Sequence, residues 1–185
     1  MKFSYCTIPN RSVETLVDIA VRSEQAGVDL LWIPDEEFYR DPFAVLSAIG
    51  ARTSKLGLGL GITNPYTRHP VQVARAMATV QDLRQEPVIV GIGAGLKHTR
   101  EALAAPDGKF VSITRDAIVA MKQLFAGERV SVENSVFKIA GAKLDFLPHV
   151  APKIYVASTH PEAFRMAGEV ADGVIVRNVA EPDAM

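Results

Sequence analysis

The stretch from residue 57 to residue 70, GLGLGITNPYTRHP, holds the densest group of side chains that could do chemistry. Its first half alternates glycine with apolar residues, which predicts a buried strand whose backbone a ligand can approach closely. Its second half gathers hydrogen-bond donors and acceptors, namely Thr63, Asn64, Thr67, Arg68 and His69. Parallel α/β folds bind ligands at the carboxyl ends of their strands. The residues alone leave two interpretations open, a ligand site and an ordinary strand-to-helix turn.

A second candidate site is the sequence STHP at residues 158–161, which follows an apolar run and precedes a helical pattern. Free backbone N–H groups and the helix dipole favour an anion at such a helix start. The hydroxyl groups of Ser158 and Thr159 would add donors, so the segment predicts a phosphate site. Simple helix capping is the alternative.

Acidic and histidine side chains at the same expected edge are candidates for proton transfer. Residues 35–37 read DEE and follow the apolar run LLWI, so Asp35 could position a substrate or hold a proton. Three adjacent acids are equally typical of a solvated loop. Among the histidines, His69 and His160 stand at expected strand ends, where they would lie at the mouth of the fold.

Composition argues against several other classes of function. The 185 residues carry a net charge of −1 and no basic run, so we expect no nucleic-acid partner. No apolar stretch could span a bilayer and the first residues lack a sustained apolar signal region, which predicts a cytoplasmic protein without a membrane partner. Cys6, the single cysteine, is expected to be a buried small hydrophobe. Hydrolase motifs and clustered metal ligands are missing from the sequence, so we expect no metal.

Strand-like and helix-like patterns alternate along the chain without a linker. Apolar runs predict strands at residues 3–8, 30–33, 56–63, 87–93, 153–157 and 173–176. Helical spacing, caps and prolines predict five helices. They run from a cap at Ser12 to about 27, over 43–52 after a cap at Asp41 and a proline at 42, from 70 to about 81, from a cap at Ser112 or Thr114 to 126, and over 161–171. Residues 99–110 look like a polar connection, 130–146 a hairpin or irregular strands, and 177–185 a loop or frayed tail.

This alternation predicts one α/β domain over residues 1–185 with a parallel sheet, either closed as a barrel or open and doubly wound. Glycine spacing argues against a dinucleotide fold. The runs GIGAGL at 91–96 and GLGLGI at 57–62 both lack the last glycine of the G-x-G-x-x-G fingerprint. An open-sheet nucleotide-binding enzyme is therefore the weakest functional hypothesis.

The eight residues TNPYTRHP at 63–70 closely resemble a segment of the luciferase-like flavin and deazaflavin oxidoreductases. They are most similar to the branch of methylenetetrahydromethanopterin reductase, which uses the deazaflavin coenzyme F420. GIGAG at 91–95 and AGEVADG at 167–173 follow in the expected order. The resemblance implies a (β/α)8 barrel of the TIM type. Such a barrel takes about 250 residues, and this chain reaches only the sixth strand, so we expect a fragment or an incomplete barrel of about six β/α units with two exposed sheet edges.

The resemblance also implies an oxidoreductase that transfers hydride between F420, or alternatively FMN, and a small organic substrate. The cofactor carries the hydride chemistry and the protein orients it. A non-catalytic flavin-binding protein, or a structural remnant of such an enzyme, is the alternative. The catalytic candidates are Asp35 and His69, the acid and the histidine that stand at expected strand ends.

The family pattern assigns cofactor contacts to three segments. A cis peptide between Gly61 and Ile62 would form a bulge behind the flavin ring, with Thr63 beside it and Asn64 bonded to the ring edge. The phosphate group would lie at the ends of the fourth and fifth strands. The residues that these segments supply for the phosphate are Gly93, Ala94, Gly95, Ala157, Ser158 and Thr159.

Two further points follow from the resemblance. Family members often dimerise through their second and third helices, and the small residues Ala74, Ala76 and Ala78 of the third helix would allow two copies of this chain to pack closely. The family commonly has a Gly-Arg pair in the turn before the fourth strand. This chain has Arg84-Gln85-Glu86-Pro87 there, so the resemblance does not predict the usual turn or its arginine contact for this chain.

Overall fold

The structure, a computed structural model, describes residues 2–176. Six parallel strands form one sheet in the order β1-β2-β3-β4-β7-β8, and β5 and β6 form a separate antiparallel hairpin. Their bounds are β1 Ser4–Cys6, β2 Leu30–Ile33, β3 Gly57–Thr63, β4 Ile89–Ile92, β5 Val130–Glu133, β6 Lys138–Ala142, β7 Lys153–Ala157 and β8 Gly173–Ile175. The tail predicted for residues 177–185 lies outside the described residues.

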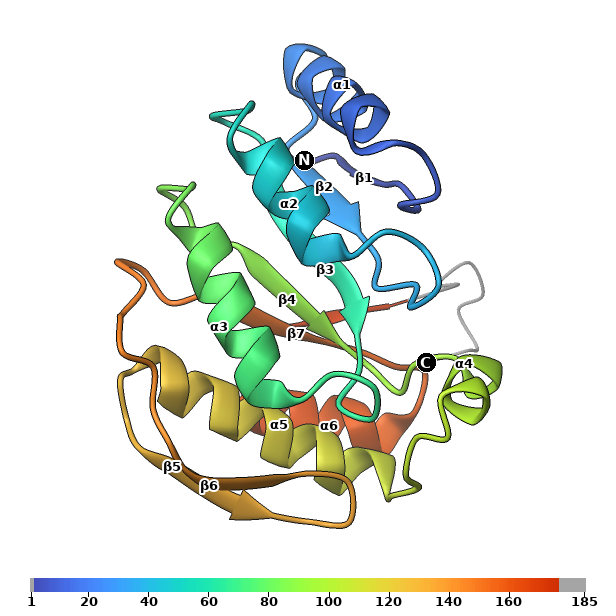
Figure 1. Ribbon diagram of the computed structural model, residues 1–185, viewed down its shortest axis with the longest axis vertical. Coiled ribbons are helices and arrows are strands. Elements are labelled where there is room, and N and C mark those ends of the chain that lie inside the picture. Colours follow the sequence, from blue (N-terminus) through green and yellow to red (C-terminus); the bar gives the residue numbers. More distant parts are fainter. Residues whose placement is uncertain (1, 177–185) are drawn as a thin grey trace.

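Helices line one face of this sheet, except α4, which lies beyond the ends of the strands, and the hairpin lies on the outer side of α5 (Figure 1). The helices are α1 Val13–Gln25, α2 Pro42–Gly50, α3 Pro70–Gln81, α4 Lys97–Ala102, α5 Phe110–Phe125 and α6 Pro161–Val170. Every neighbouring pair in the six-stranded sheet is parallel. The predicted fold class is therefore confirmed as an incomplete β/α barrel, with six parallel strands in the described residues where a full barrel has eight.

Alternate residues of β3 face opposite sides of the sheet. Leu58 and Leu60 are buried in the core between sheet and helices. Gly59 and Gly61 lie under the indole ring of Trp32. A Cβ atom on Gly59 would stand 2.4 Å from Trp32 Cε3, and one on Gly61 would stand 2.8 Å from it. The glycines of this strand therefore make room for a side chain that lies flat on the inner face of the sheet.

The amino end of β3 is held by a buried arginine. Arg84 is 5% exposed, and its guanidinium donates to the backbone oxygens of Leu56, Gly50 and Thr53 at 3.0 Å each. Two of these carbonyls belong to the carboxyl end of α2 and the residues after it, where backbone acceptors lack helical partners. The turn before β4 thus has an arginine contact, which the sequence had left unpredicted.

Caps set the helix starts as predicted for α1 and α2. The Ser12 hydroxyl accepts from the amide of Thr15 at 3.2 Å, and the Asp41 carboxylate accepts from the amide of Phe43 at 3.0 Å, just after the proline at the first helical position. Gly27 has φ +80° after α1, the left-handed conformation that favours glycine.

The prediction for the start of α5 is wrong. The helix begins at Phe110, before both expected caps, and residues 97–102 form the short helix α4 within and beside the predicted polar connection. The hydroxyl of Ser112 donates to the carbonyl of Lys109 at 3.1 Å, inside the first turn. Thr114 is fully buried on the helix's inner face. Both hydroxyl residues look like caps in sequence but are absorbed into the helix.

Two expectations about single residues are also wrong. Cys6 is exposed, because β1 is an edge strand whose three residues all face solvent in part. Ala74 and Ala78 are fully buried inside the chain, because α3 packs against α2 and α5. These two alanines cannot supply the close contact between copies that was expected of them. The homodimer itself stays a prediction.

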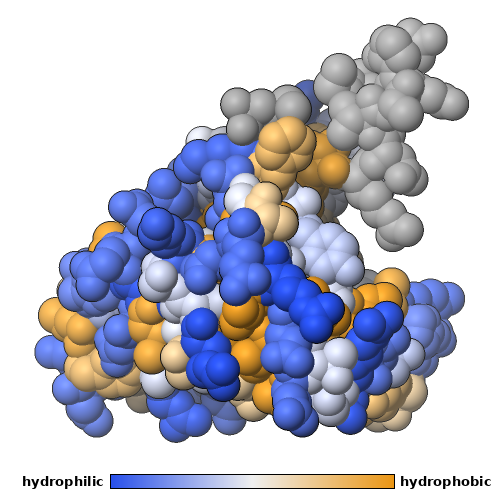
Figure 2. All heavy atoms as spheres, turned by 90° about the horizontal axis from the view of Figure 1, so that it is seen from above, coloured by the Kyte–Doolittle hydropathy of each residue, from blue (hydrophilic) through white to orange (hydrophobic). Residues whose placement is uncertain are grey.

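The surface seen from the α1 side is mostly hydrophilic, with apolar side chains in small separate patches (Figure 2). Within residues 2–176, every helix is too short or too polar to cross a lipid bilayer.

Candidate functional site

The elbow, defined here as residues 63–69 between β3 and α3, is folded around one asparagine. Asn64 Oδ1 accepts from the amides of Tyr66 and Thr67 at 3.0 Å each, which is the side-chain turn that asparagine favours. Asn64 Nδ2 donates to Glu37 Oε1 at 2.9 Å, and Thr67 Oγ1 donates to the same oxygen at 2.9 Å. Glu37 therefore ties the elbow to the loop that follows β2.

A buried ion pair provides the second tie between β2 and the elbow. Arg68 Nε and Nη2 donate to the two carboxylate oxygens of Asp35 at 3.0 Å each, and Thr63 Oγ1 donates to Asp35 Oδ2 at 2.7 Å. The Asp35 side chain has no exposed surface. Burial raises the pKa of Asp35, against the opposing hydrogen bonds from Arg68 and Thr63. Arg68 also contacts Asp41 at 3.0 Å, so one guanidinium joins β2, the elbow and the start of α2.

The three segments predicted to bind cofactor meet at the carboxyl edge of the sheet. The amide of Gly93 donates to the carbonyl of Thr63 at 2.9 Å, which joins the ends of β4 and β3. A Cβ atom on Gly93 would stand 3.1 Å from the carbonyl oxygen of Ala157, the last residue of β7. Gly95 has φ +69°, and a Cβ there would lie 2.7 Å from Asn64 Nδ2.

The bulge in β3 matches the one that the resemblance implied. The peptide bond between Gly61 and Ile62 is cis, and the pairing register of β3 with β4 shifts between Leu60 and Thr63. The side chain of Ile62 lies over β4, where a Cβ on Gly93 would stand 2.4 Å from Ile62 Cδ1. Ile62 is half-buried, so it remains accessible from the inner side of the sheet.

The start of α6 has the properties of an anion site. Its N-cap residue, His160, makes no side-chain cap bond, and Pro161 occupies the first helical position. The hydroxyl of Ser158 accepts from the amide of His160 at 3.1 Å and keeps its own proton to donate. Thr159 is exposed. Uncapped amides with adjacent hydroxyls suit a phosphate chemically.

A model of the luciferase-like monooxygenase family matches residues 1–185. The chain belongs to this family. It is 31% identical over 182 residues to the 5,10-methylenetetrahydromethanopterin reductase of Methanolobus tindarius, covering 98% of this chain and 55% of that protein. It is 35% identical over 172 residues to an F420-dependent glucose-6-phosphate dehydrogenase of Beutenbergia cavernae, covering 86% and 51%.

Structural comparison agrees with the sequence comparison. The coenzyme F420 dependent tetrahydromethanopterin reductase from Methanopyrus kandleri superposes with a TM-score of 0.87 at 26% identity, over 95% of this chain and 55% of that one. The chain spans about half the length of the curated relatives it matches.

The two residues predicted as catalytic in this luciferase-like chain have their polar atoms engaged within the protein. Both carboxylate oxygens of Asp35 are bonded to Arg68. His69 Nδ1 accepts from the amide of Val71 at 3.3 Å, and its Nε2 lies 3.2 Å from the carbonyl oxygen of Lys138 in the hairpin. Their part in catalysis stays a prediction, and these contacts point to roles in positioning.

Several residues that shape the site escaped the sequence analysis. The ring of Tyr66 lies 4.8 Å from the guanidinium carbon of Arg100, and its hydroxyl donates to the carbonyl of Gly108 at 3.2 Å. The segment from α4 to the start of α5 therefore packs on the elbow. In the sequence, Glu37 is one of three adjacent acids with nothing to distinguish it. The TNP sequence could have predicted the Asn64 turn, but no local signal pairs Asn64 with Glu37.

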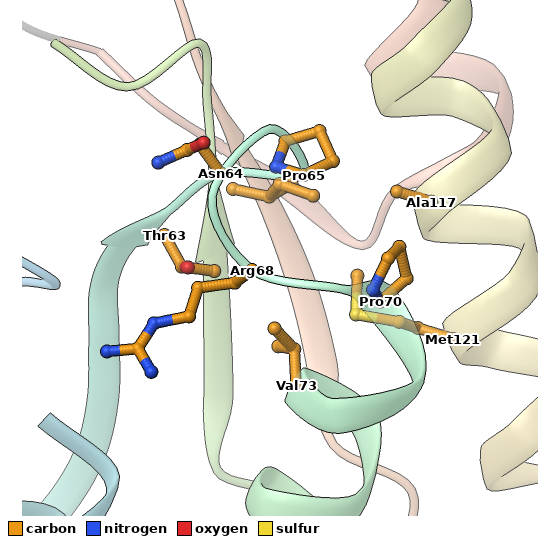
Figure 3. Close-up of a pocket in the computed structure, with 9 residues that line it drawn as sticks. Thr63, Asn64, Pro65, Arg68, Pro70, Val73, Ala117 and Met121 are labelled. Carbon is orange, nitrogen blue, oxygen red and sulfur yellow. The ribbon is translucent and has the colours of Figure 1, made fainter. Parts of the chain in front are cut away.

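The space beneath the elbow is a packing gap and not a ligand pocket. Figure 3 shows Pro65, Pro70, Val73, Ala117 and Met121 meeting there, between the elbow, α3 and α5. The gap is too small to hold a water molecule. Within residues 2–176, His, Cys, Asp and Glu side chains form no cluster of three that could hold a metal ion.

Proposed function

We propose that this protein binds the deazaflavin coenzyme F420 at the carboxyl edge of its sheet and takes part in hydride transfer between F420 and a small organic substrate. One observation carries the proposal: the ends of β3, β4 and β7 meet, with the Gly93 amide 2.9 Å from the Thr63 carbonyl oxygen and Ala157 on the other side of Gly93. Family membership and relatives named for F420 support it.

Most of the residues predicted to contact the cofactor are accessible on this edge, but Thr63, Asn64 and Gly93 are buried. Both polar atoms of the Asn64 side chain are bonded within the protein, which leaves none for the predicted bond to the ring edge. Ile62, Ala94, Gly95, Ala157 and Ser158 are half-buried, so each retains accessible surface. In the proposed arrangement the ring lies against the bulge at Gly61 and Ile62. The phosphate group lies near the start of α6, at Ser158 and Thr159, and at the loop 93–95.

Bound F420 would supply two-electron hydride chemistry, and the protein would supply orientation. The Asp35–Arg68 pair holds the end of β3 against β2, and Glu37 holds the turn around Asn64. In this proposal Asp35 acts through the elbow and does not touch the substrate. Orientation of this kind is a large part of what enzymes contribute to bimolecular steps.

The cofactor choice rests on the relatives. F420 is preferred because proteins named for it are 29–35% identical to this chain, and FMN is the alternative. The test is to mix the purified protein with F420 and, separately, with FMN, and to measure cofactor retained after desalting. Retention of F420 supports the proposal. Retention of FMN alone would overturn the cofactor choice and leave a luciferase-like flavin protein.

A cofactor-binding or structural role without catalysis is the second candidate. The observation that favours it is that the polar atoms of Asp35 and His69, the two residues predicted as catalytic, are bonded within the protein. The same desalting experiment separates the two candidates in part, because a protein that retains neither cofactor supports a structural role. A protein that retains F420 but reduces no substrate in the presence of reduced F420 supports a binding role.

A further inference from the structure

The β5–β6 hairpin stands outside the alternation of strands and helices, and the proposed cofactor contacts do not use it. It lies along the outer side of α5 (Figure 1). Val130, Phe137 and Ile139 bury its inner side, with 2%, 6% and 4% of their surfaces exposed. The hairpin is therefore packed firmly on the body of the protein and can act as a fixed support.

His69, the last residue of the elbow, connects this hairpin to the start of α3. Its Nε2 lies 3.2 Å from the carbonyl oxygen of Lys138, the first residue of β6. Its ring packs edge-on against Phe137, with centroids 5.9 Å apart and an interplanar angle of 71°. Its Nδ1 accepts from the amide of Val71 at 3.3 Å. One imidazole thus contacts the hairpin and caps the helix.

The partners determine which ring nitrogen carries the proton. A carbonyl oxygen only accepts, so Nε2 of His69 must donate, and Nδ1 must be the unprotonated acceptor for the Val71 amide. Pro70 has no N–H, so the Val71 amide is the first amide of α3 that needs a cap. Both nitrogens of the neutral ring are used, and the ring is fixed at both ends.

The elbow is thereby held from two sides. Asp35 and Glu37 hold it from the β2 side, and His69 holds it from the hairpin side. We propose that His69 is a positioning residue that couples the β5–β6 hairpin to the elbow, so that the packing of the hairpin sets the geometry of the surface offered to the cofactor. The link to cofactor geometry rests on the proposed function, whereas the mechanical coupling does not.

The coupling is tested with two conservative variants and a control. In His69→Asn, the amide oxygen can replace Nδ1 as the cap, but the shorter side chain loses the Lys138 carbonyl. Phe137→Leu removes the ring contact from the hairpin side. Ser131→Ala is the control, because the Ser131 hydroxyl accepts from the amide of Gly141 at 3.0 Å elsewhere in the hairpin and does not touch His69.

Hydrogen exchange of the elbow amides is measured in the cofactor-free proteins, and F420 affinity is measured by titration. We expect His69→Asn to raise exchange at Tyr66, Thr67 and Arg68 and to weaken F420 binding, each by about three- to tenfold, as loss of one hydrogen bond predicts. Phe137→Leu should act in the same direction. The double variant should resemble His69→Asn alone, since both changes break one connection.

The outcomes separate the two proposals. Unchanged elbow exchange in His69→Asn, or the same change in Ser131→Ala, overturns the coupling whether or not a cofactor binds. Additive effects in the double variant also overturn it. If wild-type protein binds neither F420 nor FMN while His69→Asn still raises elbow exchange, the coupling is supported and the cofactor proposal falls.

Discussion

The two ends of β3 are each held by an arginine, but in different ways. At the amino end, Arg84 is buried and donates to the backbone oxygens of Leu56, Gly50 and Thr53. At the carboxyl end, Arg68 pairs with the carboxylate of Asp35, which also accepts from Thr63. The first cluster joins a cation to main-chain oxygens and to the Thr53 hydroxyl. The second joins side chains of the elbow to a carboxylate in the loop after β2.

This difference indicates that one end of β3 serves stability and the other serves binding. The Arg84 cluster satisfies carbonyls that would otherwise be buried without partners, so its effect is on stability. The Arg68 cluster includes two residues of the elbow, so we expect a change in it to alter the shape of the surface proposed for the cofactor. Substitutions at the two ends should therefore separate stability from binding.

Arg84→Met should give the largest effect on folding. It leaves the three carbonyls that Arg84 bonds without a donor, and each buried unsatisfied group costs about 1–3 kcal/mol. We expect the free energy of unfolding to fall by about 3 kcal/mol or more. Urea denaturation followed by circular dichroism measures it. The control is Arg52→Met, at an exposed arginine, and equal losses in the two variants would contradict the role of Arg84.

Replacing both Ser158 and Thr159 by alanine should weaken cofactor binding with little loss of stability. Each hydrogen bond lost to a charged group is worth about 1.5–3 kcal/mol, so at least a tenfold rise in the F420 dissociation constant is expected. The only hydrogen bond of these hydroxyls within residues 2–176 is from the amide of His160 to Ser158. Unchanged affinity in the double variant would remove the phosphate from this loop.

Asn64→Asp should weaken the elbow from within. The new carboxylate can still accept from the amides of Tyr66 and Thr67, but it loses the donor to Glu37 and places two carboxylates side by side. We expect stability to fall by about 1–2 kcal/mol. Adding Glu37→Gln restores a donor and should recover part of the loss, as thermal denaturation of the single and double variants can show. No recovery would mean that Glu37 does not hold the elbow.

The smallest expected effect is a difference in pH dependence between the two ends. Near the amino end of β3, the Glu24 carboxylate accepts from the amides of Ser54, Lys55 and Leu56. Desolvation raises the pKa of Glu24, but these hydrogen bonds outweigh it and the net pKa is lowered from 4.5. Its contribution to stability is present above the unfolded-state pKa and is lost as the pH falls through the folded-state pKa.

The contribution of Asp35 to stability changes with pH in the opposite direction. Burial raises its pKa above the ordinary 3.8, so the folded state binds the proton more tightly and stability falls as the pH rises from 3.8 through the raised value. Glu24→Gln should therefore flatten the acid loss of stability, and Asp35→Asn should steepen it. Urea midpoints between about pH 3 and 6 test this, and the same slope change in both variants would contradict the comparison.

Much of the fold was predictable because its signals are local. The strands at 30–33 and 153–157 match β2 and β7, and the caps at Ser12 and Asp41 start α1 and α2. The start of α5 was not predictable, because serine and threonine are common both as caps and inside the first turns of a helix. The residue types of Ser112 and Thr114 therefore do not show whether either one is the cap. A hydroxyl's role depends on whether the preceding residues continue the helix, which tertiary packing decides.

The site was predictable in position but not in its connections. The elbow, the loop 93–95 and the loop 157–159 were each placed at a strand end, and the parallel sheet brings strand ends together. The pairs Asn64–Glu37 and Asp35–Arg68 depend on the pairing register of β2 and β3, which the sequence of neither segment determines alone. His69 illustrates the same limit, since its partner Lys138 is 69 residues away.

The most direct test of the division between the two ends of β3 is an F420 titration of Arg68→Met and Arg84→Met, each confirmed as folded by circular dichroism, beside the wild-type protein. We expect Arg68→Met to raise the F420 dissociation constant about tenfold or more, because the elbow loses its bond to Asp35, and Arg84→Met to stay within about twofold of wild type. An Arg84→Met protein that loses F420 affinity as much as Arg68→Met, or an Arg68→Met protein that binds like wild type, would contradict it.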